Sequence, residues 1–424
     1  MPSVRNREVL GWCLYDWANS AFATTIMAAV LPPYFQNVAA SSLPDWRATA
    51  LWGFTASGAT LAVALFAPLL GAVADLAGRR RAFFCAFWLL GVGSTGALFL
   101  VGEGGWKLCL PLFALGLVGF SLSNTFYDSF LPLVATGEGM DRVSSLGYAL
   151  GYLGGGLLLA VNLIMIGRPE WFGLPDASWG ARASFLSVAI WWAAFSLPFL
   201  LWVKEPGDVG KVDWRAGIRE LKGTLGEVGR HREAAKFLVA FWLYADGIST
   251  VIKMAAIYGA EVGIGTQDLV AALLLTQFVA FPFSLLFGRL SERIGVKRAL
   301  YIALGVYASV CGWAYFLKDA WQFWVMAGTV GTVQGGAQAL SRSFFARMVP
   351  KERTAEFFGF FSTVAKFAGI LGPFMFGLVG SIFHTSRAAA PAISALFLCG
   401  AAVLSRVKVD RCGTSYLWTT SRRS

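Results

Sequence analysis

The stretch Gly71–Arg81, which reads GAVADLAGRRR, decides the fold, because it lies between two long apolar runs and recurs later in the chain. The later copy, Gly288–Arg298, reads GRLSERIGVKR. The offset of 217 residues (288 − 71) is close to half of the 424-residue chain. Each copy places a carboxylate at the end of an apolar helix, then a glycine that can leave the helix, then a basic cluster suited to water and phospholipid head groups. The pattern predicts a duplicated chain whose two copies both mark a membrane–water boundary.

The composition is typical of a polytopic membrane protein. Hydrophobic residues make up 57% of the chain and charged residues 14%, and the mean hydropathy is +0.62, which is too apolar for a soluble chain of this size. The formal net charge of +11 could indicate nucleic-acid binding, but the basic residues lie between apolar runs and not along one solvated face. The six cysteines show neither metal-ligand nor disulfide spacing, so we expect free thiols, no metal and no nucleic-acid partner.

Roughly twelve runs are long enough to cross the hydrocarbon core, which takes about 20 apolar residues. They begin near Leu10, Ala48, Ala82, Lys107, Ser144, Arg182, Lys236, Leu269, Ala299, Ala320, Phe357 and Ala389. With alternating sides, 26 of the 35 Lys and Arg residues fall on the side of both termini, six on the other side and three within helices. Because positive charge marks the cytoplasmic side, both termini are predicted to be cytoplasmic.

These runs predict an all-α membrane protein with two pseudo-symmetric six-helix bundles. We expect a first bundle at residues 1–203, a cytoplasmic linker at 204–235, a second bundle at 236–407 and a cytoplasmic tail at 408–424. Apolar residues recur at helical spacing among basic residues in the linker, which predicts an amphipathic helix. That helix either lies on the inner membrane surface or serves as a plain linker. The apolar positions are Trp214, Ile218, Leu221, Leu225 and Val228.

Glycines mark two further features of the helices. Gly147, Gly151 and Gly155 repeat at four-residue spacing, which predicts close contact between the fifth helix and a neighbour. A bend in the eleventh helix is predicted by Gly369, Gly372, Pro373 and Gly377.

A duplicated six-helix unit, with this loop motif between its second and third helices, resembles the major facilitator superfamily. Narrower strings resemble the vacuole-effluxer branch, named for an autophagy-related exporter of amino acids from the yeast vacuole. The strings are YDWANSAF at 15–22, GYALGYLGG at 147–155, YADGIST at 244–250 and GGAQALSRSFF at 335–345. The resemblance implies a twelve-helix solute transporter whose two bundles rock against each other. The short middle loop is similar to that of bacterial members and favours a bacterial inner membrane.

Two polar stripes within apolar helices are candidate solute-binding or proton-coupling sites, since an ionisable side chain inside a span costs about 2.5–3.5 kcal/mol and faces a cavity or a partner. Asp16 and Asn19 share one face of the first helix. The alternative is that Asp16 only caps the helix and is hydrated from the cytoplasm. Asp246, Thr250 and Lys253 share one face of the seventh helix and could bind an amino-acid-like zwitterion. The alternative is an internal ion pair that makes insertion tolerable.

Two triplets with the same spacing are candidate gate residues. They are Asn124, Tyr127 and Asp128 in the fourth helix, then Gln338, Ser341 and Arg342 in the tenth. In the superfamily these helix ends close the inner gate. We therefore expect Asp128 to pair with Arg342 or Lys366 across the two halves when the protein faces outward. The alternative is a polar face needed only for local packing.

The resemblance also implies a conformational role for the repeated loop. Asp75 and Arg79 are similar to the pair that braces the second and eleventh helices in the outward-facing state. A purely topological role for the basic cluster is the alternative. The motif positions are Gly71, Asp75, Gly78 and Arg79 in the first copy, then Gly288, Glu292 and Gly295 in the second.

Several signatures of other mechanisms are absent from the sequence. There is no Gly-x-x-x-x-Gly-Lys-Ser/Thr string, no zincin spacing and no Gly-x-Ser-x-Gly elbow. We therefore expect no enzyme activity and no cofactor, with energy from an ion or solute gradient and with Asp16 and Asp246 as proton carriers. The expected function is secondary transport of a small polar solute, amino-acid-like and outward, by a monomer in the bilayer. The alternatives are a proton-driven drug or metabolite exporter, and a non-transporting receptor or lipid-handling protein.

Overall fold

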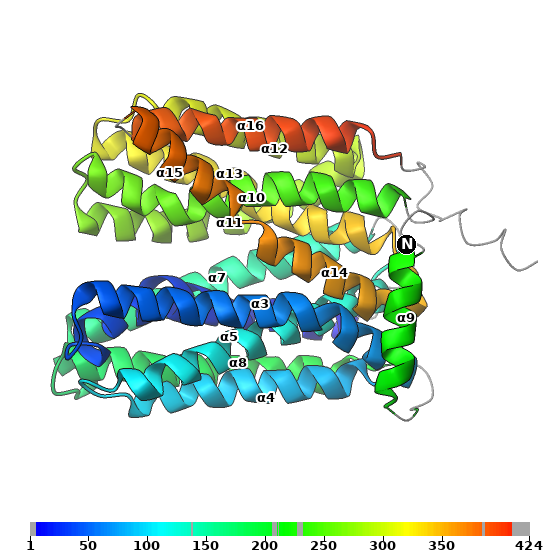
Figure 1. Ribbon diagram of the computed structural model, residues 1–424, viewed down its shortest axis with the longest axis horizontal. Helices are drawn as coiled ribbons and strands as arrows, with labels where there is room; N and C mark the ends of the chain where they lie inside the picture. Colours follow the sequence, from blue (N-terminus) through cyan, green and yellow to red (C-terminus); the bar gives the residue numbers. More distant parts are fainter. Residues whose placement is uncertain are drawn as a thin grey trace, which may run out of the picture.

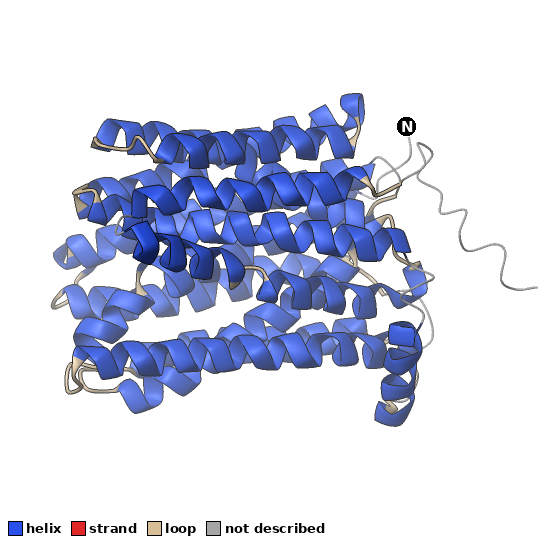
Figure 2. Cartoon of the chain, turned by 45° about the horizontal axis from the view of Figure 1, so that its top comes forward, coloured by secondary structure: helices blue, strands red, loops and turns tan. Residues whose placement is uncertain are grey.

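The computed structural model describes residues 6–136, 139–205, 210, 212–226, 232–383 and 386–408, and every regular element in these ranges is helical (Figure 2). Figure 1 shows the long helices running side by side in two groups. Helix α9 (Trp214–Gly226) lies across the right-hand end of the lower group (Figure 1). The end of the molecule that carries α9 is called the linker side below. The expected tail after residue 408 lies outside the described residues.

The first half contains six helical segments that each run the length of the bundle, and each such segment is called a path below. The first path begins with α1 (Asn6–Ala21) and continues through a π-helical segment (Phe22–Ala29), the short α2 (Leu31–Tyr34) and a second π-helical segment (Phe35–Ala39). The other paths are α3 (Asp45–Ala77), α4 (Arg80–Ala97), α5 (Trp106–Ser129) followed by α6 (Leu131–Val134), α7 (Gly139–Gly167) and α8 (Ala177–Trp202).

The second half repeats this arrangement with one broken path. Its helices are α10 (Arg232–Glu261), α11 (Thr266–Ile294), α12 (Val296–Ala314), α13 (Ala320–Ala346), α14 (Thr354–Phe367), α15 (Leu371–Phe383) and α16 (Ser386–Ser405). Helices α14 and α15 together take the place of one span, because only three residues separate them. Gly369 lies in this break with φ +116°, a conformation that favours glycine.

Eight helices in the described ranges are long and apolar enough to cross a membrane by composition alone. They include α3, α4, α5, α7 and α8 in the first half, and α10, α11 and α16 in the second. Each of the four other expected spans is either interrupted or less apolar. The first path is interrupted by π-helix, α12 carries Lys297 and Arg298 in its first turn, α13 carries Gln338 and Arg342, and the eleventh path is broken.

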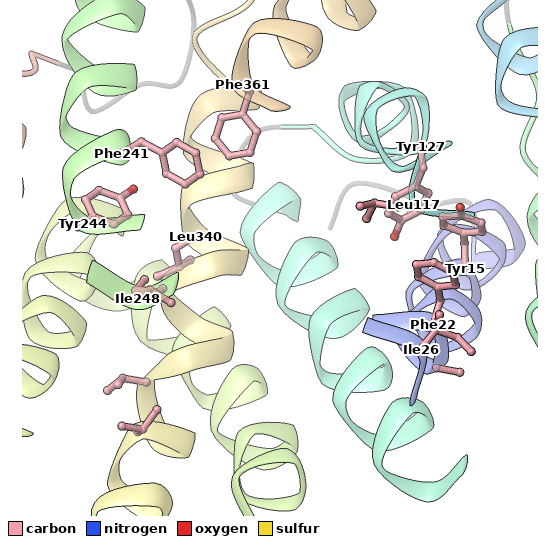
Figure 3. Packing of buried hydrophobic residues seen from close by; sticks show 14 of the residues in the cluster. Tyr15, Phe22, Ile26, Leu117, Tyr127, Phe241, Tyr244, Ile248, Leu340 and Phe361 are labelled. Carbon is pink, nitrogen blue, oxygen red and sulfur yellow. The ribbon is translucent and has the colours of Figure 1, made fainter. Parts of the chain in front are cut away.

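Each half has its own aromatic core next to the contact between the halves (Figure 3). In the first half the rings of Tyr15 and Tyr127 lie 4.6 Å apart, and both side chains are fully buried. In the second half Phe241 of α10 stacks on Phe361 of α14 at 4.2 Å. Such ring contacts add about 0.5–1.5 kcal/mol each to the burial of apolar area. These ring contacts lie within each half, while the buried apolar residues of both halves form one continuous cluster.

Candidate gate and solute-binding residues

Arg342 connects the two halves through buried ion pairs. It lies on α13, and only 2% of the residue is exposed. Its Nη2 is 2.9 Å from Oδ2 of Asp16 on α1, and its Nη1 is 3.1 Å from Oδ1 of Asp128 on α5. One guanidinium of the second half is therefore held by two carboxylates of the first half.

Other groups of the first half complete the surroundings of the Arg342 guanidinium. Its Nε donates to the hydroxyl of Ser144 at 2.9 Å, and its Nη2 donates to the Ser144 carbonyl at 3.0 Å. The ring centroids of Tyr148 and Trp12 lie 4.3 Å and 4.6 Å from the guanidinium carbon, which is within the range of cation–π attraction. Every one of these contacts crosses between the halves. A movement that separates the halves here must break them together.

Gly147 of α7 provides the space for this cluster. A Cβ at this position would lie 2.4 Å from Oδ2 of Asp16 and 3.1 Å from Nη2 of Arg342. Real Cβ contacts are not as short as 2.4 Å, so any side chain at residue 147 would force the Asp16 carboxylate to shift from its position beside Arg342. Gly147 therefore leaves room for the Asp16–Arg342 ion pair as well as for close packing of α7.

A second contact between the halves joins the repeated loop to α14. The two carboxylate oxygens of Asp75 accept hydrogen bonds from the backbone N–H groups of Glu356, at 2.8 Å, and Ala355, at 3.3 Å. Arg80 donates its Nε–H to Asp75 and its Nη2–H to the carbonyl of Lys351, the latter at 3.0 Å. A carboxylate at the N-terminus of a helix satisfies free N–H groups and interacts favourably with the helix dipole. Asp75 therefore binds the start of α14 in the other half.

The partner of Asp75 is Arg80 and not Arg79, the residue expected from the resemblance. Arg79 instead donates its Nε–H to the carbonyl of Gly210 in the linker at 2.9 Å. Gly78 ends α3 in the left-handed conformation, with φ +58°. Gly71 allows α14 to come close, because a Cβ there would lie 2.3 Å from the carbonyl oxygen of Ala355.

The second copy of the loop motif makes a different contact. Gly288 of α11 packs against Ser145 of α7, and a Cβ there would lie 2.8 Å from the Ser145 Cβ. Gly295 has φ +88°, and Glu292 is exposed. The ion pair near this copy joins Asp141, at the start of α7, to Arg347, at the end of α13, with 2.6 Å between Oδ2 and Nη2. The sequence gives no signal for this pair, because charged residues are common at the ends of membrane helices, where both residues lie.

Two of the remaining candidate gate residues lie within the first half. The amide of Asn19 donates to the side-chain oxygen of Asn124 at 3.0 Å, which joins α1 to α5. The ring of Tyr127 stacks on Trp12, with centroids 4.5 Å apart. These contacts hold Asp16 and Asp128 on neighbouring helices, so that both carboxylates reach the same guanidinium.

The candidates on α13 make one contact within the second half and one between the halves. The hydroxyls of Ser341 and Tyr244 are 2.6 Å apart, which joins α13 to α10. The Tyr152 hydroxyl of α7 donates to the side-chain oxygen of Gln338 at 2.9 Å, across the halves. Lys366 lies in the last turn of α14 and is half-buried.

Asp246 binds the start of α15 at the break in the eleventh path. Its Oδ2 accepts from the backbone N–H of Leu371 at 3.0 Å, and its Oδ1 accepts from that of Gly372 at 2.9 Å. Asp246 is fully buried, and the hydroxyl of Thr250 donates to its carbonyl at 2.7 Å. The side chain of Lys253 lies outside the described residues. In this arrangement both Asp246 oxygens are occupied by the protein's own backbone.

An apolar cavity of about 70 Å³ lies beside Thr250 within the second half. Its walls include Met254, Tyr258, Cys311 and Phe323. The walls are almost wholly apolar, so the cavity suits a hydrocarbon group better than the charged groups of a zwitterion.

The cross-half polar contacts gather on the linker side. Helices α3, α5 and α13 end there, α14 begins there, and Arg353 at the start of α14 also binds Glu220 of α9, with 3.1 Å between Nη2 and Oε1. Two groups of helices that lie side by side, joined by polar contacts on one side, are the arrangement expected of a membrane transporter of the major facilitator class.

The chain belongs to the vacuole effluxer Atg22-like family, whose model matches residues 42–415. It is 36% identical over 406 residues to the "Uncharacterized MFS-type transporter YxiO" of Bacillus subtilis (strain 168), covering 93% of this chain and 94% of that one. It is 26% identical over 283 residues to autophagy-related protein 22 of Yarrowia lipolytica, covering 58% of this chain and 46% of that relative. These findings confirm the family expected from the resemblance.

Solved structures of major facilitator transporters share the fold. The human organic anion transporter MFSD10 (TETRAN) superposes with a TM-score of 0.73 at 15% identity, covering 95% of this chain and 100% of that one. FucP in the outward conformation superposes with a TM-score of 0.69 at 13% identity, covering 96% of this chain and 99% of that one. The predicted all-α major facilitator fold is therefore confirmed.

Proposed function

We propose that this protein is a secondary transporter that moves a small polar, amino-acid-like solute outward across a bacterial inner membrane. The linker side faces the cytoplasm, and the monomer works by rocking the bundle of residues 1–203 against that of residues 236–407, with residues 204–235 joining them. The observation that carries the proposal is the Arg342 cluster, in which all the polar partners of one buried guanidinium come from the opposite half. Such a cluster closes one side and opens as a unit.

The chemistry of the cluster supports an amino-acid-like solute. When the halves separate on the linker side, Asp16 and Asp128 lose their cation, while Arg342 loses two anions. The carboxylates can then accept a proton or an ammonium group, and the guanidinium can bind a carboxylate in a bidentate manner. A zwitterion supplies one ammonium group for the two carboxylates to share and one carboxylate for the guanidinium, so each buried charge regains a partner of opposite sign. The expected site on α10 has its Asp246 already bound to α15, which favours the Arg342 cluster as the solute site.

A thermal-shift screen of the purified protein, followed by uptake into proteoliposomes, tests this proposal. A ligand that binds only the folded protein at 100 times its Kd stabilises it by about 2.7 kcal/mol. We expect amino acids to stabilise the wild type, with the effect lost in Asp16→Asn and Arg342→Gln and retained in Arg168→Gln, whose side chain is 67% exposed.

The results test the solute site, the class of substrate and the proton coupling separately. Stabilisation by an amino acid that survives both cluster substitutions would refute the solute site. Stabilisation and uptake of drugs alone would favour a drug or metabolite exporter. Uptake that does not respond to an imposed pH gradient would exclude proton coupling.

A further inference from the structure

Helix α9 lies at the linker-side end of the first bundle. In Figure 1 it stands crosswise to the long helices of that bundle. It packs on α3 at Gly217, where a Cβ would lie 2.3 Å from Cγ2 of Val73. Val73 precedes the last residue of α3, Ala77, by four positions, so this contact lies about 6 Å inside the helix end. An amphipathic helix at the end of the spans is placed to meet lipid head groups.

The sequence of α9 gives its sides different chemistry. Gly217 and Leu221 face the protein, and Glu220 faces the second half through its ion pair with Arg353. On the flank away from that ion pair, Trp214 and Ile218 remain 49% and 43% exposed. The Trp214 ring lies 6.4 Å from that of Phe83, which belongs to the first turn of α4.

The basic residues of α9 continue this exposed flank. At about 100° per residue, Arg215, Arg219 and Lys222 follow Trp214 and Ile218 around the helix, and all three are exposed. The one acidic residue of the described helix, Glu220, lies on the opposite flank. An apolar edge at the end of the spans, bordered by three cations, matches the two layers of an anionic membrane surface.

We propose that this flank, made of Trp214, Arg215, Ile218, Arg219 and Lys222, binds the head groups of anionic phospholipids. Trp214 and Ile218 enter the boundary between head groups and acyl chains, while the three basic side chains contact the phosphates. An acidic protein or a nucleic acid would use the cations, but neither explains two large apolar side chains beside them at the end of a span.

Hydrogen–deuterium exchange of the full-length protein in lipid nanodiscs tests the proposal with site resolution. One set of nanodiscs contains only phosphatidylcholine, and the other contains phosphatidylcholine with phosphatidylglycerol. We expect amides of Trp214–Gly226 to exchange more slowly with phosphatidylglycerol present. Each basic residue near an anionic surface strengthens binding roughly fivefold, so the selectivity should fall by that factor for each one neutralised. Higher salt should reduce it further.

Three variants and one soluble probe make the outcome decisive. The triple variant R215Q/R219Q/K222Q should abolish the lipid-dependent difference, R215K/R219K should retain it, and Arg168→Gln should leave it unchanged. Glycerol phosphate added to phosphatidylcholine nanodiscs should not reproduce the protection. Equal exchange of α9 in both lipids, or a difference that survives the triple variant, would overturn the proposal. Full protection by glycerol phosphate would also overturn it, because a free anion would then suffice.

Discussion

Replacing Gly147 by alanine should open the linker side without removing any charge. The added Cβ would lie 2.4 Å from Oδ2 of Asp16, so the carboxylate must move away from Arg342. A hydrogen bond to a charged group contributes about 1.5–3 kcal/mol. Losing one such bond, at about 2 kcal/mol, shifts the equilibrium between closed and open states roughly 30-fold. Alanine is also the better helix former by about 1 kcal/mol, so the helix itself is not weakened.

Electron–electron double resonance measures this shift. Spin labels at Lys204 and Arg298 report on the two halves, because these exposed residues lie at the linker-side ends of α8 and α12. In a cysteine-free background, Gly147→Ala should transfer population from a short to a long distance. Gly167→Ala on the same helix is the matched control, since a Cβ there meets no atom within 4 Å. An unchanged distance distribution in Gly147→Ala would refute the role of the Asp16–Arg342 pair as a lock.

Four further substitutions test the contact of the repeated loop and the break in the eleventh path. Arg80→Gln should open the linker side by roughly tenfold, at about 1.4 kcal/mol for lost charge-assisted bonds, whereas Arg79→Gln should not; the same spin-label distances check this. Gly372→Ala would place a Cβ 1.9 Å from Oγ1 of Thr250 and should lower the Tm by several degrees in a thermal-shift assay. Asp246→Asn should also lower the Tm, because an amide oxygen satisfies only one of the two backbone donors; a wild-type Tm in that variant would contradict its structural role.

Much of the fold could be predicted from apolar periodicity, because the membrane imposes a length on every span. Each of the twelve expected helix starts lies within five residues of an observed start, and α9 lies inside the expected linker. The internal breaks were less visible. Gly369 and Gly372 predicted a bend in the eleventh helix, but not that Asp246 would bind the freed N–H groups, since that contact depends on how α10 packs.

Spacing in the sequence alone does not identify which arginine of the repeated loop contacts Asp75. Asp75 and Arg79 are four residues apart and would share a face of a continuous helix. Gly78 ends that helix in the left-handed conformation, so Arg79 leaves the face of Asp75. Arg80 then begins α4 and turns back toward the carboxylate. Gly78 indicated the end of the helix, but only the geometry of the turn decided which arginine returns.

The duplication explains why the ion pair between Asp128 and Arg342 requires the two halves to carry opposite charges at this position. Asp128 is 22 residues after the first residue of α5, Trp106, and Arg342 is 22 residues after the first residue of α13, Ala320. The two residues are therefore equivalent positions of the repeat, and they contact each other at 3.1 Å. Equivalent positions meet only near the axis that relates two copies. With the same charged residue in both copies, like charges would face each other there and hold the linker side open. Divergence to an acid in one half and a base in the other turns this repulsion into attraction. The ion pair between Asp128 and Arg342 therefore exists because this position of the repeat is no longer symmetric.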